Sequence, residues 1–207
     1  YDMALTSGLW RIAVYDGDGD IAAFVRTENG TTLLGFPHRT GDRTAYQIAA
    51  PGQHEKFEQF DWRVADSIPE TDIPPRAGIP DREDVRFETI GDSVALVAAV
   101  PAMAEIFDRN TGSPESATVG AVVAATRLRE TFSRRLSLLT GADIQMFPAS
   151  GPGAGALDDY DRLEIDPENA ETSIDGSEIL LGEVRLGEQR YAQGALTLRR
   201  DGNAVGT

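Results

Sequence analysis

An aromatic residue and a cation stand next to each other at Trp62 and Arg63, within the sequence FDWRVAD. An indole ring can close one side of a pocket, and a neighbouring guanidinium can hold a carboxylate through two parallel hydrogen bonds. Both residues lie in a proline-rich segment, residues 37–88, of the length that compact domains use for lids and binding loops. Our candidate ligand-binding residues are Phe36, Tyr46, Trp62 and Arg63.

A structural interpretation of the same residues competes with this one, and we favour it. Phe57, Phe60 and Trp62 would form a small apolar cluster under the loop, with Arg63 paired to one of the 34 carboxylates of the chain. The two interpretations are separable, because only the first predicts that replacing Trp62 and Arg63 abolishes stabilisation by a ligand.

Three carboxylates at alternate positions, Asp16, Asp18 and Asp20, resemble the start of a calcium-binding loop. The full pattern then requires a glycine and, six residues later, a glutamate, where this chain has Ile21 and Thr27. A solvated hairpin turn is therefore the preferred interpretation, and the three aspartates remain a weak metal-site alternative. Chelation should lower the melting temperature if the site binds calcium.

The other chemistry-bearing motifs yield no catalytic residue. His38 and His54 are the two histidines, and neither belongs to an HExxH or GxSxG pattern. The sequence GPGAGA at residues 151–156 lacks the spacing of a dinucleotide fingerprint and the Lys-Ser/Thr of a P-loop. We expect surface histidines, a flexible loop, no cofactor and no enzymatic activity in this domain.

Charge and composition narrow the function classes further. With 19 basic and 34 acidic side chains, the net charge is −15, which repels nucleic acids and anionic membranes. The absence of cysteine excludes disulfides and thiolate metal sites. The longest apolar runs, Val94–Val100 and Val119–Ala125, are too short to span a membrane, for which about 20 residues are needed. We interpret the chain as a soluble domain excised from a longer protein.

Strand and turn signals predict antiparallel structure at the start of the chain. LWRIAVYD and IAAFVRT read as a hairpin about Asp16-Gly17-Asp18-Gly19, and Asn29-Gly30 leads into a third strand, TTLLGF. The segment from Pro37 to Glu88 should then cross the sheet, with at most a short helix near 54–62.

Two central strands and a helix should follow this segment. The runs Val94–Val100 and Val119–Ala125 are apolar on both faces, with Pro101 ending the first and a surface loop over Glu105–Ser116. A helix capped by Thr126 should run to Gly141, exposing an i,i+4 pair of Glu130 and Arg134.

The C-terminal third should form a smaller β layer. ADIQMF reads as a strand, residues 148–156 as a flexible loop, and residues 177–206 as two strands with a turn into a third. Gly187-Glu188 and Asp201-Gly202 mark the turns.

In this order, the sequences WRIAVYDGDGDI, VALVAAVPAM, GAVVAATRLRETFSRRLSLLTGADIQMF and GEQRYAQGALTLRRDGNAVG resemble the extracytoplasmic Cache and CHASE-type sensor domains. The shared motifs include a strand ending in Pro, a Thr-Gly after the helix, Tyr-x-x-Gly-x-Leu and Gly-x-x-x-Gly. The Tyr, Arg, Trp and Asp pattern of the amino-acid-binding members is not visible. The resemblance implies an α+β, PAS-like fold: an antiparallel sheet of about five or six strands with flanking helices, plus the C-terminal β layer.

The resemblance also implies a function and a setting. We expect residues 1–207 to form one sensor domain, with possible sub-modules 1–126 and 127–207. It would be extracytoplasmic, periplasmic or extracellular, in a membrane-anchored histidine kinase, chemoreceptor or cyclic-nucleotide enzyme. The resemblance implies flanking membrane helices outside this chain, a homodimer in the full-length receptor and an unknown small-molecule ligand. From the net charge, we expect no nucleic-acid partner. The alternatives are a carboxylate-dependent hydrolase and a cation-binding adhesion module built on Asp16–Asp20.

Overall fold

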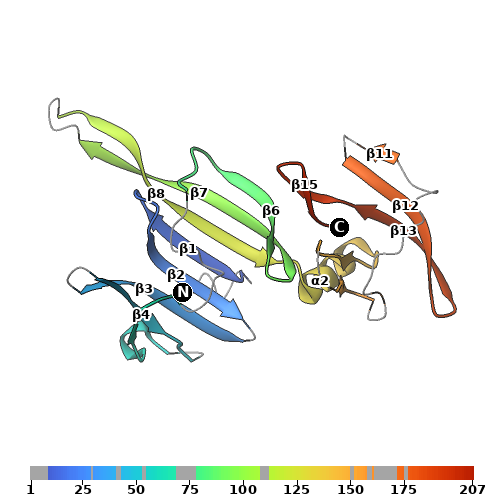
Figure 1. Cartoon of the computed structure of the whole chain (residues 1–207), viewed down its shortest axis with the longest axis horizontal. Coiled ribbons are helices and arrows are strands. Elements are labelled where there is room, and N and C mark those ends of the chain that lie inside the picture. Colours follow the sequence, from blue (N-terminus) through green and yellow to red (C-terminus); the bar gives the residue numbers. More distant parts are fainter. Residues whose placement is uncertain are drawn as a thin grey trace. The chain divides into compact units, whose positions relative to one another are not determined.

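The computed structural model describes residues 9–28, 30–40, 43–52, 55–68, 78–107, 112–149, 152–157, 160, 172–174 and 177–207. The chain divides into two compact units. Unit 1 comprises Tyr1–Val85 and Val97–Thr126, and unit 2 comprises Arg86–Leu96 and Arg127–Thr207. Each unit is described by itself (Figure 1).

Eight strands form one antiparallel sheet, in the order β5-β4-β3-β2-β1-β8-β7-β6. β8 is the last of these eight strands in the sequence, and it pairs with the first, β1, in the middle of the sheet. The bounds are β1 Arg11–Asp16, β2 Ile21–Glu28, β3 Thr31–Thr40, β4 Arg43–Ala49, β5 Arg63–Ala65, β6 Asp84–Ile90, β7 Ser93–Phe107 and β8 Pro114–Arg127, with a 3-10 helix, η1, at Phe57–Gln59.

The first hairpin forms where the sequence predicts it. β1 and β2 pair antiparallel, with Ala13 opposite Phe24, and the turn closes with a 2.9 Å hydrogen bond from the amide of Asp16 to the carbonyl of Asp20. Gly30, with φ 77°, occupies the left-handed region in the next turn, which glycine enters without steric cost. The predicted third strand follows as β3.

The pleat of these strands sorts side chains onto two faces. On one face, Ala13, Tyr15, Ile21, Phe24 and Ile48 form a buried cluster. On the other face, a smaller cluster contains Leu34, Ala49 and Phe60 from the segment before β5.

The prediction that Pro37 begins a crossing segment is wrong. β3 continues to Thr40, and β4 pairs with it, placing Pro37 opposite Tyr46. Proline lacks an amide hydrogen, but the pairing of β3 with β2 ends at Gly35, so Pro37 costs no hydrogen bond on that side. The Gly41-Asp42 dipeptide before β4 is a hairpin signal that would have found this strand.

The predicted end of a strand at Pro101 is also wrong. β7 runs through Pro101 to Phe107, and β8 begins at Pro114, so strand replaces much of the loop expected over Glu105–Ser116. β6 has seven residues and turns into β7 at Gly91-Asp92, so it is too short to reach Pro101. On the β6 side, Pro101 therefore removes no ladder hydrogen bond.

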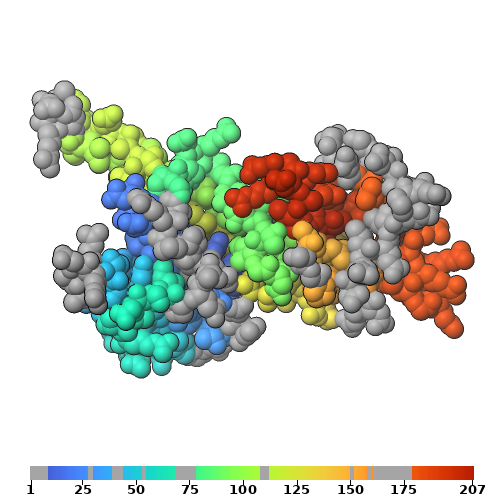
Figure 2. Space-filling view, in the orientation of Figure 1, coloured from blue at the N-terminus to red at the C-terminus, as the bar shows by residue number. Residues whose placement is uncertain are grey.

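The distal halves of β7 and β8, residues 100–107 and 114–119, form an arm that we call the β7–β8 arm. β1 pairs with β8 only from Gly120 onward. In Figures 1 and 2 the arm extends away from the other strands of unit 1. Its apolar side chains face solvent, including Met103, Ile106 and Phe107, of which Phe107 is 69% exposed.

Unit 2 is built around the helix α2, Glu130–Thr140. The helix ends at Gly141 in the left-handed conformation, φ 72°, and Arg134 pairs with Glu130 at 2.7 Å, both as predicted. The N-cap is Arg129 and not Thr126, because β8 continues to Arg127. The remaining strands are β9 Gln145–Met146, β10 Ala154–Gly155, β11 Thr172–Ile174, β12 Ser177–Leu186, β13 Gln189–Leu196, β14 Leu198–Arg200 and β15 Asn203–Gly206.

The predicted fold class, an α+β PAS-like domain, is wrong. Among the described residues there are fifteen strands against one α-helix and one 3-10 helix, and the large sheet has eight strands instead of five or six. The helices expected to flank the sheet are not found in the described part of the chain. The physical reason is that segments interpreted as crossing or looping, around Arg43–Ala49 and Met103–Phe107, pair as additional or longer strands.

Candidate functional site

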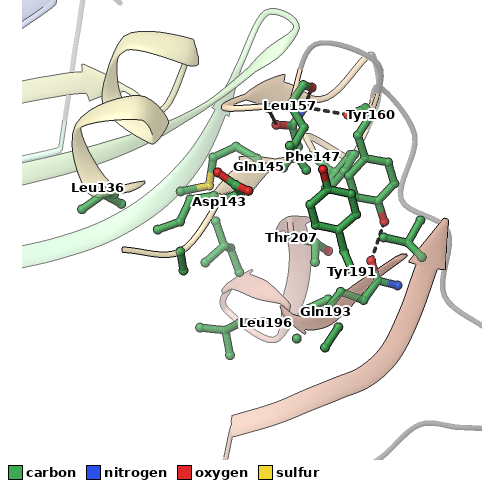
Figure 3. A pocket seen from close by; sticks show the side chains of 18 residues that line it. Leu136, Asp143, Gln145, Phe147, Leu157, Tyr160, Tyr191, Gln193, Leu196 and Thr207 are labelled. Atoms are coloured by element: carbon green, nitrogen blue, oxygen red, sulfur yellow. Dashed lines mark hydrogen bonds between the residues drawn. The ribbon is translucent and has the colours of Figure 1, made fainter. Parts of the chain in front are cut away.

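Unit 2 contains a pocket of about 570 Å³, within the range of small-molecule sites. It is lined by the end of α2, by the segment from Ala142 to Phe147 and by strand β13. Leu157, Tyr160 and Thr207 also contribute to the lining (Figure 3). None of the four ligand-binding residues predicted from the sequence lines this pocket.

The side chain of Gln145 fixes one wall of this pocket. Its Nε2 donates hydrogen bonds to the carbonyls of Tyr160, at 2.6 Å, and Leu157, at 3.2 Å, while its Oε1 accepts from the amide of Leu157. Leu157 and Tyr160 are thereby both tied to β9. Gly155 permits the close approach of β10 to β9, because a Cβ there would lie 2.7 Å from the Cα of Gln145.

Aromatic rings form the side of the pocket opposite α2. Phe147 and Tyr160 pack edge to face with ring centroids 5.1 Å apart, and Tyr160 is 6% exposed. The hydroxyl of Tyr160 donates to Oε1 of Gln193 at 2.6 Å, which ties this ring to β13. Tyr191 lies two residues earlier on the same strand, and its ring contributes to the pocket (Figure 3).

The charge of the pocket lining is simple. Among the described residues that line it, Asp143 is the one acidic side chain, and none is Lys, Arg or His. Most of the other side chains are apolar, among them Leu136, Met146 and Val184. Such a lining suits a largely apolar molecule that carries no negative charge.

A second, more polar pocket of about 420 Å³ lies at the start of α2. The guanidinium of Arg129 donates to Oγ of Ser93 at 3.0 Å and to Oδ1 of Asp92 at 3.3 Å, and Ser93 donates to Asp92 at 3.0 Å. The hydrogen bond from Ser93, backbone hydrogen bonding and the positive charge of Arg129 lower the pKa of Asp92. We interpret this triad as structural, because its groups satisfy one another while joining β7 to α2.

The four candidate residues from the sequence do not come together in unit 1. The rings of Phe36 and Trp62 meet edge to face, with centroids 5.1 Å apart. Tyr46 packs on the opposite face of the sheet, against the cluster of Phe24 and Ile48, and Arg63 is exposed on β5. These four side chains therefore do not line one common pocket.

The aromatic cluster itself is present. Trp62 lies 5.3 Å from Phe57 and 6.0 Å from Phe60 between ring centroids, and Phe57 and Phe60 are 5.5 Å apart. Phe60 is buried with Leu34. These distances agree with the alternative in which the three rings form an apolar cluster.

The aspartates at 16–20 lie in the turn between β1 and β2. The carboxylate of Asp16 accepts hydrogen bonds from the amides of Asp18, at 3.1 Å, and Asp20, at 2.9 Å. The described part of the chain holds no group of three or more His, Cys, Asp or Glu side chains placed to bind a metal ion. His38 is exposed on β3, and His54 lies outside the described residues.

A signal for the pocket was present in the sequence. Tyr191, Gly194 and Leu196 are the residues of the Tyr-x-x-Gly-x-Leu motif, and all three line the pocket. Gln145 and Tyr160 give no comparable signal, because their roles depend on contacts between segments that are distant in the sequence.

Within the described residues, the structure contains no helix with the length and apolarity needed to cross a membrane. Comparisons of the chain with protein-family models, with curated proteins and with solved structures give no significant match.

Proposed function

We propose that this chain is a ligand-binding domain of a membrane-anchored signal-transduction receptor, and that its ligand occupies the pocket of unit 2. The single observation that carries the binding function is the pocket itself. It combines a volume of about 570 Å³, a mainly apolar and aromatic lining and a few polar groups held by hydrogen bonds.

The sensory and extracytoplasmic parts of the proposal rest on the sequence resemblance alone. Because the PAS-like sheet is not found, the fold lends the sensory role no support, and ligand binding has to be tested first. In a receptor, a ligand that binds one conformation more tightly than another shifts the population toward it. A homodimer in the full-length protein would carry that shift to an output domain.

The two alternative functions have no specific observation in their favour. A carboxylate-dependent hydrolase requires two carboxylates that face a common substrate, and the described lining of the unit 2 pocket offers only Asp143. In the cation-binding module, Asp16 would have to release the amides of Asp18 and Asp20.

A fragment screen followed by amide chemical-shift mapping tests the proposal. Two variants change the pocket in opposite directions: Ala142→Trp adds volume from an exposed lining position, and Tyr191→Ala removes a half-buried ring. Tyr191→Phe is the matched control, because it keeps the ring and loses only the hydrogen bond to Gln189.

We expect fragments that shift the amides of residues 142–147 and 191–196 and raise the melting temperature. A ligand at 100 times its Kd stabilises the folded state by about 2.7 kcal/mol. Ala142→Trp and Tyr191→Ala should each weaken these fragments about tenfold or more, while Tyr191→Phe binds them normally. A screen without hits at these amides would overturn the proposed binding function.

A further inference from the structure

We infer that the ligand of the unit 2 pocket is an organic cation, an amine carried on an apolar body, with its ammonium group next to Asp143. This inference rests on the proposed function and specifies the chemical class of its ligand. Three observations carry it: the charge of the lining, the aromatic rings and the charge of the whole chain.

The carboxylate of Asp143 gives the pocket its sign. Since the described lining contains no cationic side chain, a carboxylate or phosphate on the ligand would face Asp143 without a compensating charge. A neutral ligand could offer Asp143 a hydrogen bond but no opposite charge. An ammonium group offers both, and charge-assisted hydrogen bonds are about twice as strong as neutral ones.

The aromatic wall favours the same ligand. Phe147, Tyr160 and Tyr191 all line the pocket, and their rings can pack against the aryl or alkyl body of the amine. In Figure 3, Asp143 lies toward the α2 side, and Tyr160 and Tyr191 lie toward the opposite side. An amine with an aryl or alkyl body can thus contact the carboxylate and the rings together.

The polar groups on the ring side are committed to holding the wall. Tyr160 donates its hydroxyl hydrogen to Gln193, and Gln145 spends its amide on the backbone of Leu157 and Tyr160. This leaves Asp143 as the group with the greatest effect on selectivity. The net charge of −15 adds a long-range attraction for cations.

Three probes with the same ring separate the effect of charge from that of shape. They are 2-phenylethylamine, a cation at neutral pH, 2-phenylethanol, its neutral analogue, and phenylacetate, an anion. Affinities are measured by chemical-shift titration at low ionic strength and again in 0.5 M NaCl, about 4 Å in screening length.

We expect the amine to bind about tenfold more tightly than the alcohol, with no measurable binding of phenylacetate. Salt should reduce the advantage of the amine. Asp143→Asn should lower amine affinity to that of the alcohol and leave the alcohol unchanged. Glu188→Gln removes the same charge from an exposed turn outside the pocket lining, and it should keep the amine preference.

The outcomes distinguish the two proposals. Equal binding of amine and alcohol, tighter binding of phenylacetate, or an amine preference that survives Asp143→Asn overturns the cation inference and leaves ligand binding intact. If none of the probes binds while the fragment screen finds pocket ligands, the cation inference again fails alone. If the screen also finds none, both proposals fail.

Discussion

At the scale of single residues, the triad of Asp92, Ser93 and Arg129 makes stability depend on pH. The hydrogen bond from Ser93 and the neighbouring Arg129 favour the ionised form, so the pKa of Asp92 lies below the value of about 3.9 for an unperturbed aspartate. A carboxyl whose pKa is lowered on folding stabilises the folded state at pH values above its unfolded pKa. That stabilisation is lost as the pH falls through the folded pKa.

Asp92→Asn should therefore lower the melting temperature at pH 7, and its difference from the parent protein should shrink as the pH approaches 3. Asp92 is largely exposed, so the effect should be small. Calorimetry across pH 3–7 measures it, with Asp81→Asn as a control at an exposed position before β6. A difference that is constant over this range would show that Asp92 acts by another route.

At the scale of elements, the close pairing of β1 with β8 leaves no room for a side chain at Gly120. Asp16 pairs with Gly120, and a Cβ at Gly120 would collide with the carbonyl group of Tyr15, since even its carbon would be only 3.2 Å away. Gly120→Ala should therefore cost about 1–3 kcal/mol, the range typical of overpacked core substitutions. At Gly78 a Cβ would meet nothing within 4 Å.

The matched pair is thus Gly120→Ala against Gly78→Ala, compared by urea unfolding. Gly78→Ala should be neutral or slightly stabilising, because alanine restricts the unfolded chain. Equal stabilities of the two variants would contradict the tight β1–β8 approach.

The β7–β8 arm has too few neighbours to protect its backbone. Two-stranded ribbons are marginally stable in water, and opening free energies are lowest where few apolar contacts are buried. Amides at 100–107 and 114–119 should exchange with deuterium faster than those at 93–99 and 120–127, as measured by hydrogen exchange with fragment-level mass spectrometry. Uniform protection along both strands would mean that the arm is covered in solution.

The elements differ in how far local sequence determines them. The β1–β2 hairpin and the end of α2 at Gly141 were predictable, because turn and cap residues act within a few positions. Pro37 and Pro101 were misleading, because a proline ends a strand only when a neighbour needs its amide, and neighbours come from distant sequence. The pocket could not be predicted either, because it also depends on contacts between distant residues: Gln145 meets Leu157 and Tyr160 only in the folded unit.

At the scale of the whole molecule, repulsion and pairing among charges oppose each other. The excess of acidic groups, −15 in total, destabilises a compact chain. Ion pairs work against this, such as Glu88 with Arg86 at 2.9 Å and with Arg200 at 3.1 Å. Pairs with exposed partners, such as Glu130 with Arg134, contribute only about 0–1 kcal/mol each. Repulsion should therefore dominate.

Raising NaCl from 0.02 M to 0.5 M should consequently increase the melting temperature, because the screening length falls from about 20 Å to about 4 Å. A gain of about 1–2 kcal/mol corresponds to roughly 2–8 °C for a chain of this size.

A variant carrying Glu58→Gln, Asp81→Asn, Glu83→Gln and Glu188→Gln, all at exposed positions, changes the net charge from −15 to −15 + 4 = −11. It should start from a higher melting temperature and gain less from salt. Sucrose at equal osmolality controls for solvent effects, and should stabilise the parent and the variant alike. If salt instead lowered the melting temperature of the parent protein, ion pairs such as that of Glu88 would outweigh the repulsion.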